Sequence, residues 1–278
     1  MPEKINCDMA QPHPGKSSDF SRIAGRYDAT RSLPSQYLKA CYARLSKSGL
    51  LPSQGVILDA GCGTGQVSVP LAELGYQILG VDISAEMIAI SQSKLPGHSP
   101  SVYQVADVCN LPYPDASFDA VIVSKLFQHV ENWQDACREL VRVVKPGNCI
   151  FQINEKGAFS NSVRRHFSRR ADELGFSSRF LGINPHAQES ITDLMLSLGC
   201  KVSSPDMSDL KWEIDITYGD ALGWIKDGLF AEFWYLPPAI HDQLVAETAE
   251  WVQNQPRGAQ TVERLAPYLV VEAFCTPA

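Results

Sequence analysis

The amino-acid sequence predicts an α/β fold built on a mostly parallel sheet. Apolar runs of strand length alternate with helical patterns from about residue 55 to residue 155. This alternation indicates right-handed βαβ units, and so parallel strands. Several of the apolar runs also end on polar residues, at the carboxyl edge where open parallel sheets bind their ligands. These strand-end residues are Asp59, Asp82, Asp107 and Ser124.

The first strand and the turn after it are the most informative stretch, which reads VILDAGCGTGQ from Val56 to Gln66. Residues 56–58 form an apolar run that suits a buried parallel strand, and Asp59 is expected to end it. Three glycines follow, and then the helical pattern of residues 67–74. A strand that passes through a glycine turn into a helix leaves backbone N–H groups beside a ligand.

The spacing of the glycines argues against a dinucleotide. A dinucleotide fingerprint is G-x-G-x-x-G, whereas this turn is G-x-G-x-G, with Gln66 at the place of the third fingerprint glycine. The charge of Asp59 would repel a pyrophosphate and attract a ligand that carries an ammonium group. By itself the motif also fits a tight strand–helix turn without a ligand.

A second carboxylate follows the next predicted strand, residues 77–81. Asp82 lies at the tip of that strand, where a carboxylate accepts hydrogen bonds from a ribose diol. The alternative is that Asp82 or Ser84 caps the following helix, and the two roles are compatible.

With three further segments, these motifs resemble the class I S-adenosylmethionine (SAM) dependent methyltransferases. The resemblance is greatest to the small-molecule group that includes the quinone-ring methylating enzymes. It covers roughly residues 50–155, and Asn148 departs mildly from a glycine that is frequent in the family. It implies a Rossmann-like, seven-stranded, mostly parallel sheet with an antiparallel last strand, for which Pro267–Cys275 is the candidate. The three segments are VYQVADV at 102–108, FDAVIVSKLFQHV at 118–130 and CRELVRVVKPGNCIFQI at 137–153.

The resemblance implies SAM as cofactor and assigns roles to particular residues. Asp107 would bond the adenine amine, and the backbone N–H of Val108 a ring nitrogen. A helical segment before the first strand would fold over the pocket, with Tyr27 near the methionine end; a core aromatic is the alternative for Tyr27. The implied cofactor contacts are Tyr27, Arg31, Asp59, Gly61, Cys62, Gly63, Asp82, Ile83, Met87, Asp107, Val108 and Ser124.

Methyl transfer from a sulfonium is an in-line displacement with a neutral leaving group, so few catalytic residues are needed. His129 is the candidate base, because its ordinary pKa suits proton removal near neutral pH. The alternative is that His129 orients the turn and never touches the acceptor. Gln128 and Lys125 are weaker candidates for acceptor contact.

The predicted organisation is a disordered tail over 1–18 and one methyltransferase domain over 19–278, with its SAM-binding core at about 50–155. A basic helix over 159–174 would be a solvated face or a clamp for an anionic acceptor. Aromatic residues over 224–235, in a segment expected to be helical from 219 to 235, would be core packing or an apolar wall of the acceptor site. The helical cap is expected from residues 19–49, 156–186 and 217–255.

Composition limits the partners. The net charge of −7 argues against a general nucleic-acid binder. The eight cysteines form no C-x-x-C pair, so we expect no metal site and free thiols, which suit a cytoplasmic protein. No secretory signal or membrane-spanning run is visible. The expected partner is a small-molecule acceptor, aromatic or apolar in character; the alternatives are methylation of RNA or protein, and SAM binding without catalysis. Neither the acceptor atom nor the oligomeric state follows from the sequence.

Overall fold

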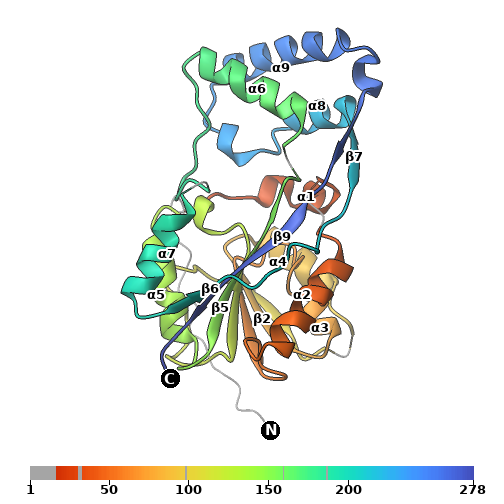
Figure 1. Ribbon diagram of the computed structural model, residues 1–278. Coiled ribbons are helices and arrows are strands. Elements are labelled where there is room, and N and C mark those ends of the chain that lie inside the picture. Colours follow the sequence, from red (N-terminus) through yellow and green to blue (C-terminus); the bar gives the residue numbers. More distant parts are fainter. Residues whose placement is uncertain (1–16, 31–32, 98, 159, 186) are drawn as a thin grey trace. The chain divides into compact units, whose positions relative to one another are not determined.

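The computed structural model describes residues 17–30, 33–97, 99–158, 160–185 and 187–278, and the chain folds as two compact units (Figure 1). The first unit holds the residues up to Asn154 together with Leu181–Met207 and Val270–Ala278. The second holds Glu155–Phe180 and Ser208–Leu269.

Seven strands of the described chain form one sheet in the order β3-β2-β1-β4-β5-β9-β6. The pairs β1–β2, β2–β3, β1–β4 and β4–β5 are parallel, whereas β6 and β9 are antiparallel. The predicted fold class is therefore confirmed, including the antiparallel strand near the end of the chain. The strands are β1 Val56–Ala60, β2 Gln77–Asp82, β3 Val102–Val105, β4 Ala120–Val123, β5 Cys149–Lys156, β6 Lys201–Ser203 and β9 Tyr268–Cys275.

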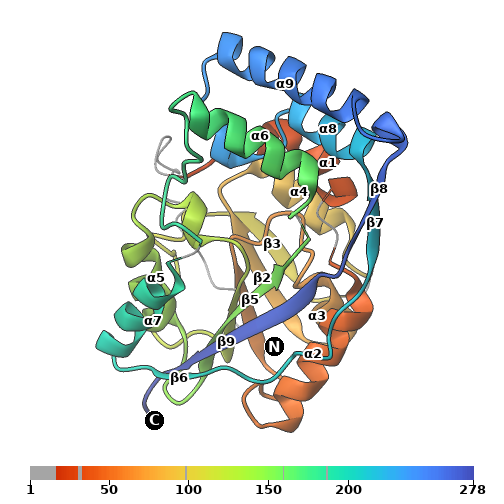
Figure 2. The ribbon, with the colours of Figure 1, turned by 45° about the horizontal axis from the view of Figure 1, so that its top comes forward.

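Helices cover both faces of this sheet, which explains why the central strand β4 (Ala120–Val123) is apolar throughout. All four residues of β4 are buried. Helix α5 turns Ala136, Leu140 and Val143 into the core, at the spacing of one helical face. Helices α2 (Ser35–Lys47), α3 (Val69–Glu73) and α4 (Ala85–Ser93) lie on one side, and α5 (Trp133–Val143) and α7 (Gln188–Ser197) on the other (Figures 1 and 2).

The N-terminal segment belongs to the first unit. It contains η1 (Ser21–Ile23) and α1 (Ala24–Thr30). Residues 17 and 18, expected in a disordered tail, are paired: Ser17 forms an antiparallel bridge with Val130, and the Ser18 N–H donates to the His129 carbonyl at 2.8 Å. The rest of the predicted tail, residues 1–16, lies outside the described residues.

The second unit differs in extent from the predicted cap of residues 19–49, 156–186 and 217–255. Residues 19–49 belong to the first unit, and the second unit continues to residue 269. Two of its strands, β7 and β8, pair antiparallel. The expected helix over 219–235 is wrong: α8 ends at Lys226, and Gly228 takes a positive φ of 62°. The elements are α6 Ser162–Glu173, β7 Ile214–Thr217, α8 Tyr218–Lys226, η3 Ala231–Phe233, α9 Pro238–Gln253, η4 Gly258–Gln260 and β8 Val262–Leu265.

The aromatic group of this unit packs in its core, where Phe230 and Phe233 are buried with Phe167 of α6. The basic helix α6 makes ion pairs inside the same unit. Arg164 pairs with Glu232, and the other pairs are Arg165–Glu263, Arg169–Glu173, Arg170–Glu173 and Arg170–Glu247. These ion pairs compensate most of the arginine charge locally. This favours the interpretation of α6 as a solvated face over that of a clamp for an anionic acceptor.

Not all cysteines are free thiols, contrary to expectation. Cys149 on β5 and Cys275 on β9 form a disulfide, 126 residues apart in the chain, which the sequence spacing does not reveal. The described thiols of Cys41, Cys62 and Cys137 are buried. Within the described ranges, no helix is long and apolar enough to cross a membrane, and no group of three or more His, Cys, Asp or Glu side chains is placed to hold a metal ion.

Candidate active site

A cleft opens at the carboxyl edge of the sheet, where β1, β2 and β4 end. Ten of the thirteen predicted site residues line it. Arg31 lies outside the described residues, and Asp59 and Cys62 are buried away from the wall. The ten are Tyr27, Gly61, Gly63, Asp82, Ile83, Met87, Asp107, Val108, Ser124 and His129.

The glycine-rich turn forms the floor of the cleft, and each of its glycines has positive φ: 69° at Gly61, 51° at Gly63 and 76° at Gly65. A Cβ on Gly61 would lie 2.5 Å from the Leu126 Cδ1, so a side chain there would have to displace Leu126 and would also be strained by the positive φ. A Cβ on Gly63 would meet no atom of the described residues within 4 Å. Gly63 therefore presents bare backbone to open space in the cleft, which suits a ligand that approaches the main chain closely.

Asp82 ties this turn to the tip of β2. Its Oδ2 accepts the Gly63 N–H and its Oδ1 the Ser84 N–H, both at 2.9 Å. The cap of α4 is Ser84, whose hydroxyl accepts the Met87 N–H at 3.2 Å. Burial raises the pKa of Asp82, and the two backbone hydrogen bonds act against that rise. Asp82 is thus an acceptor in the cleft wall that also fixes the conformation of the turn.

Asp59 does not end the first strand. Because β1 pairs with β2 and β4 as far as Ala60, Asp59 lies inside the sheet with 0% exposure. Neither of its carboxyl oxygens has a hydrogen-bond partner among the described residues. Burial raises the pKa of Asp59 to about 7, and the nearby Ser68 hydroxyl opposes this shift without outweighing it. Because Asp59 is buried and does not line the cleft, it is not placed to contact a ligand ammonium directly.

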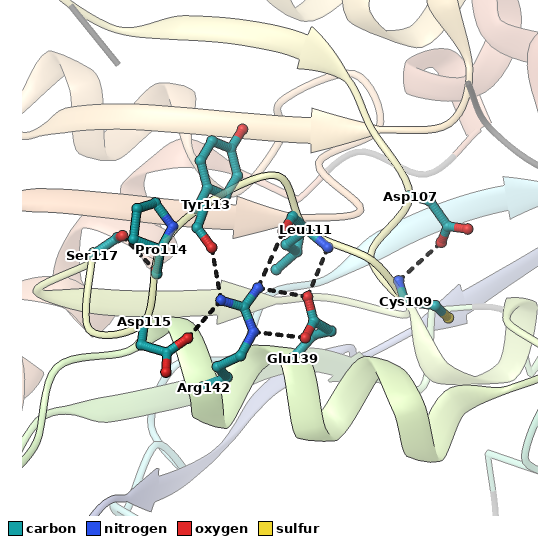
Figure 3. Close-up of polar contacts among 9 residues, drawn as sticks. All are labelled: Asp107, Cys109, Leu111, Tyr113, Pro114, Asp115, Ser117, Glu139 and Arg142. Atoms are coloured by element: carbon teal, nitrogen blue, oxygen red, sulfur yellow. Dashed lines mark hydrogen bonds and ion pairs between the residues drawn. The ribbon is translucent and has the colours of Figure 1, made fainter. Parts of the chain in front are cut away.

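The loop after β3 brings Asp107 and Val108 to the cleft. The Asp107 Oδ1 accepts the Cys109 N–H at 2.9 Å, which shapes the start of the loop. Arg142 of α5 binds a later part of the same loop, residues 111–115 (Figure 3). Its guanidinium donates to the Leu111 and Tyr113 carbonyls and to Asp115 at 2.7–3.1 Å.

Glu139, one turn earlier on α5, completes this support. Its carboxylate accepts two bonds from Arg142 at 2.7 Å and the Leu111 N–H at 2.8 Å (Figure 3). The hydrogen bonds to Glu139 are the main reason that the pKa of Arg142 lies above its ordinary value. An arginine fork suits such a task because its donors have a fixed planar geometry. The predicted motifs did not include this network.

Three aromatic side chains, from Phe20, Tyr27 and His129, line the cleft and pack against one another. The Phe20 ring lies edge-on to His129 at 4.8 Å and edge-on to Tyr27 at 6.0 Å between centroids. The His129 backbone anchors the N-terminal segment through Ser18. This set is called the aromatic wall below; Tyr27 and His129 were predicted site residues, and Phe20 is the member that the structure adds. The apolar spacing of Phe20, Ile23 and Tyr27 is the signal in the sequence that could have pointed to it.

Lys125, the second residue after the end of β4, also lines the cleft. It holds a φ of 51°, uncommon for a residue with a side chain, and its N–H donates to Asn154 Oδ1 at 3.0 Å. Gln128 is not among the lining residues, but its carbonyl accepts the Gly182 N–H at 3.0 Å. The site therefore combines acceptors for hydroxyl and amine groups, open backbone and an aromatic wall in one cleft.

Comparison with known proteins agrees with this geometry. Residues 58–151 match a model of the methyltransferase domain. The chain is 34% identical over 164 residues to the demethylmenaquinone methyltransferase of Thermus thermophilus, covering 56% of this chain and 74% of that protein. It is 28% identical over 208 residues to the enzyme of the same name in Mycobacterium tuberculosis, covering 70% and 85%. The solved YcgJ protein of Bacillus subtilis aligns with a TM-score of 0.56 at 16% identity, covering 87% of this chain and 99% of that one.

Proposed function

Because the chain belongs to the SAM-dependent methyltransferase family that includes the demethylmenaquinone methyltransferase of Thermus thermophilus, we propose that it methylates a planar aromatic or quinone-type small molecule. The observation that carries this acceptor class is the aromatic wall, which lines the same cleft as Gly63 and Asp82. Flat rings pack edge-to-face and offset against such side chains. A planar acceptor fits that surface better than a flexible polar one does.

The residues present fit SAM. The bare backbone at Gly63 leaves room for a closely bound ligand, and Asp82 can accept bonds from a ribose diol. Asp107 and the Val108 N–H are the proposed adenine contacts on the neighbouring loop. Bound SAM supplies an electrophilic methyl group on a sulfonium.

On the acceptor side, the chain has to orient a ring and take up a proton. Phe20 and Tyr27 would hold the ring, and His129, within the same wall, is the proposed base for an acceptor hydroxyl. A quinol or phenol that loses its proton becomes electron-rich at oxygen and at ring carbons, and both are sites that accept a methyl group.

The test is a methyl-transfer assay with SAM and matched acceptors: a demethylated naphthoquinol, a simple phenol, a primary amine, and a short RNA or peptide. We expect a mass gain of one methyl group on the quinol or phenol and formation of S-adenosylhomocysteine (SAH). Transfer to the amine, RNA or peptide alone would refute the aromatic acceptor. SAH binding without any transfer would favour a non-catalytic SAM-binding protein.

A further inference from the structure

The carboxylate of Asp28, on α1, binds the glycine-rich turn directly. Its Oδ1 accepts the Thr64 hydroxyl at 2.6 Å and the Gln66 side-chain amide at 2.7 Å. Its Oδ2 accepts the ammonium of Lys94, the residue that follows α4. The Asp28 side chain thus joins α1, which precedes the first strand, to the turn after β1 and to the C-terminal end of α4.

Lys94 closes the arrangement into a ring. In addition to Asp28, its ammonium donates to the Thr64 carbonyl at 2.7 Å. The side chains of Asp28 and Lys94 are 40% and 31% exposed, so the ion pair alone would contribute little. Directional bonds to a charged group are stronger than neutral ones, and here several share one carboxylate. Burial acts to raise the pKa of Asp28, but the hydrogen bonds outweigh it and its pKa lies below the usual value.

The segment that Asp28 holds is short and also contacts α4, where the Ser21 and Ser84 hydroxyls lie 2.8 Å apart. Helix α1 has seven residues, too few for a helix to be stable by itself. Among the described side chains of residues 21–29, those of Ile23 and Ala24 are buried. Yet this segment carries Tyr27 into the cleft wall, next in sequence to Asp28.

The other end of the Asp28 ring is also next to the cleft. Thr64 follows Gly63, whose N–H is held from the opposite side by Asp82. The turn is therefore fastened between two carboxylates, one in the cleft wall and one on α1. Of the two, Asp28 is the one that belongs to the helix carrying Tyr27 of the aromatic wall.

We propose that Asp28 is a positioning residue that, with Lys94, holds α1 against the glycine-rich turn and so pre-forms the cleft for the cofactor. The proposal rests on the proposed function, because it assigns the ring to the cofactor side of the same cleft. When only a fraction of the molecules has the cleft formed, the apparent affinity for the ligand is reduced by that fraction. A cleft that is formed in advance avoids this loss. Loss of the ring should then weaken cofactor binding while the groups that touch the cofactor stay in place.

The experiment measures SAH affinity by calorimetry for the wild type, Asp28→Asn, Lys94→Gln and the double variant. We expect each single variant to weaken SAH binding about tenfold, and the double variant to weaken it by no more than either single one, because both remove the same ring. The melting temperature is recorded for each variant. The matched control is Glu73→Gln, which removes the similarly exposed 2.8 Å ion pair between Lys39 on α2 and Glu73 on α3 and should leave SAH affinity within twofold.

Kinetics separate positioning from simple stabilisation. In Asp28→Asn the KM for SAM should rise about tenfold while kcat at saturating SAM stays within threefold of the wild type. A lower melting temperature with unchanged SAH affinity and KM would overturn the proposal, and so would additive effects in the double variant. Wild-type SAH binding without transfer to any aromatic acceptor would refute the proposed function and leave the Asp28 result valid.

Discussion

Replacement of Asp82 by alanine tests the cofactor side of the cleft. The Asp82 carboxylate does two things at once. It accepts the Gly63 and Ser84 N–H groups at 2.9 Å, and it lines the cleft at the tip of β2. Alanine removes both the acceptor in the wall and the bond that holds the turn.

The size of the effect follows from the bonds that are lost. Hydrogen bonds to a charged group contribute about 1.5–3 kcal/mol, so the loss of the ribose contact should weaken SAH binding by this amount, about 10- to 150-fold. The Gly63 N–H would lose its partner as well. We therefore expect an additional fall of about 1–2 kcal/mol in the free energy of unfolding.

Calorimetric titration with SAH and urea unfolding measure the two losses separately. Asp119→Ala is the matched control, because the Asp119 carboxylate also accepts a backbone N–H, from Val56 at 2.9 Å, and pairs with Lys145 at 2.6 Å. Asp119 is not among the residues that line the cleft. The control should lose stability but keep SAH affinity within twofold. Equal SAH affinity in Asp82→Ala and the wild type would refute the reasoning and leave Asp82 a structural residue.

Three further predictions concern other parts of the site. His129→Ala, as removal of the proposed base, should cut turnover about 10²- to 10⁴-fold with SAH affinity within twofold; equal losses in turnover, SAH affinity and melting temperature would make His129 a scaffold. The pKa of Asp59, about 7 in the fold, exceeds its unfolded value of 3.8, so the folded state holds a proton that the unfolded chain releases, and stability falls as pH rises through this window. Between pH 5 and 7 the free energy of unfolding should fall by roughly 2 kcal/mol more in the wild type than in Asp59→Asn, and parallel urea-unfolding curves for the two proteins would contradict the assignment. Arg142→Ala should lower the free energy of unfolding by about 2 kcal/mol and weaken SAH binding several-fold, because the loop that carries Asp107 loses its support; an unchanged SAH affinity would show that this loop holds its shape without Arg142.

Local sequence pattern predicted much of this cleft. Asp82, Asp107 and Ser124 follow apolar runs, and parallel strands bring the residues after such runs to one edge. The glycine spacing likewise indicated a tight turn between a strand and a helix, and the structure places positive φ at each of its three glycines. These features depend on neighbours in the chain, so a single sequence carries them.

The parts that were missed depend on partners far apart in sequence. Asp59 stays inside β1 because pairing with β2 and β4 continues to Ala60, and a strand's end is set by its neighbours. Phe20 joins the aromatic wall beside His129 on a segment whose residues 17 and 18 pair with residues 130 and 129. The Arg142 bonds and the Cys149–Cys275 disulfide likewise join segments with no shared local motif.

The most direct test of the account is a crystal structure of the protein with SAH. We predict that the adenine lies beside Asp107 and Val108, that the ribose hydroxyls bond to Asp82, and that the amino-acid end lies along the glycine-rich turn. The sulfur should then face a space bounded by Phe20, Tyr27 and His129. SAH bound elsewhere, or with its sulfur turned away from the aromatic wall, would contradict the assignment of this cleft as the place of methyl transfer.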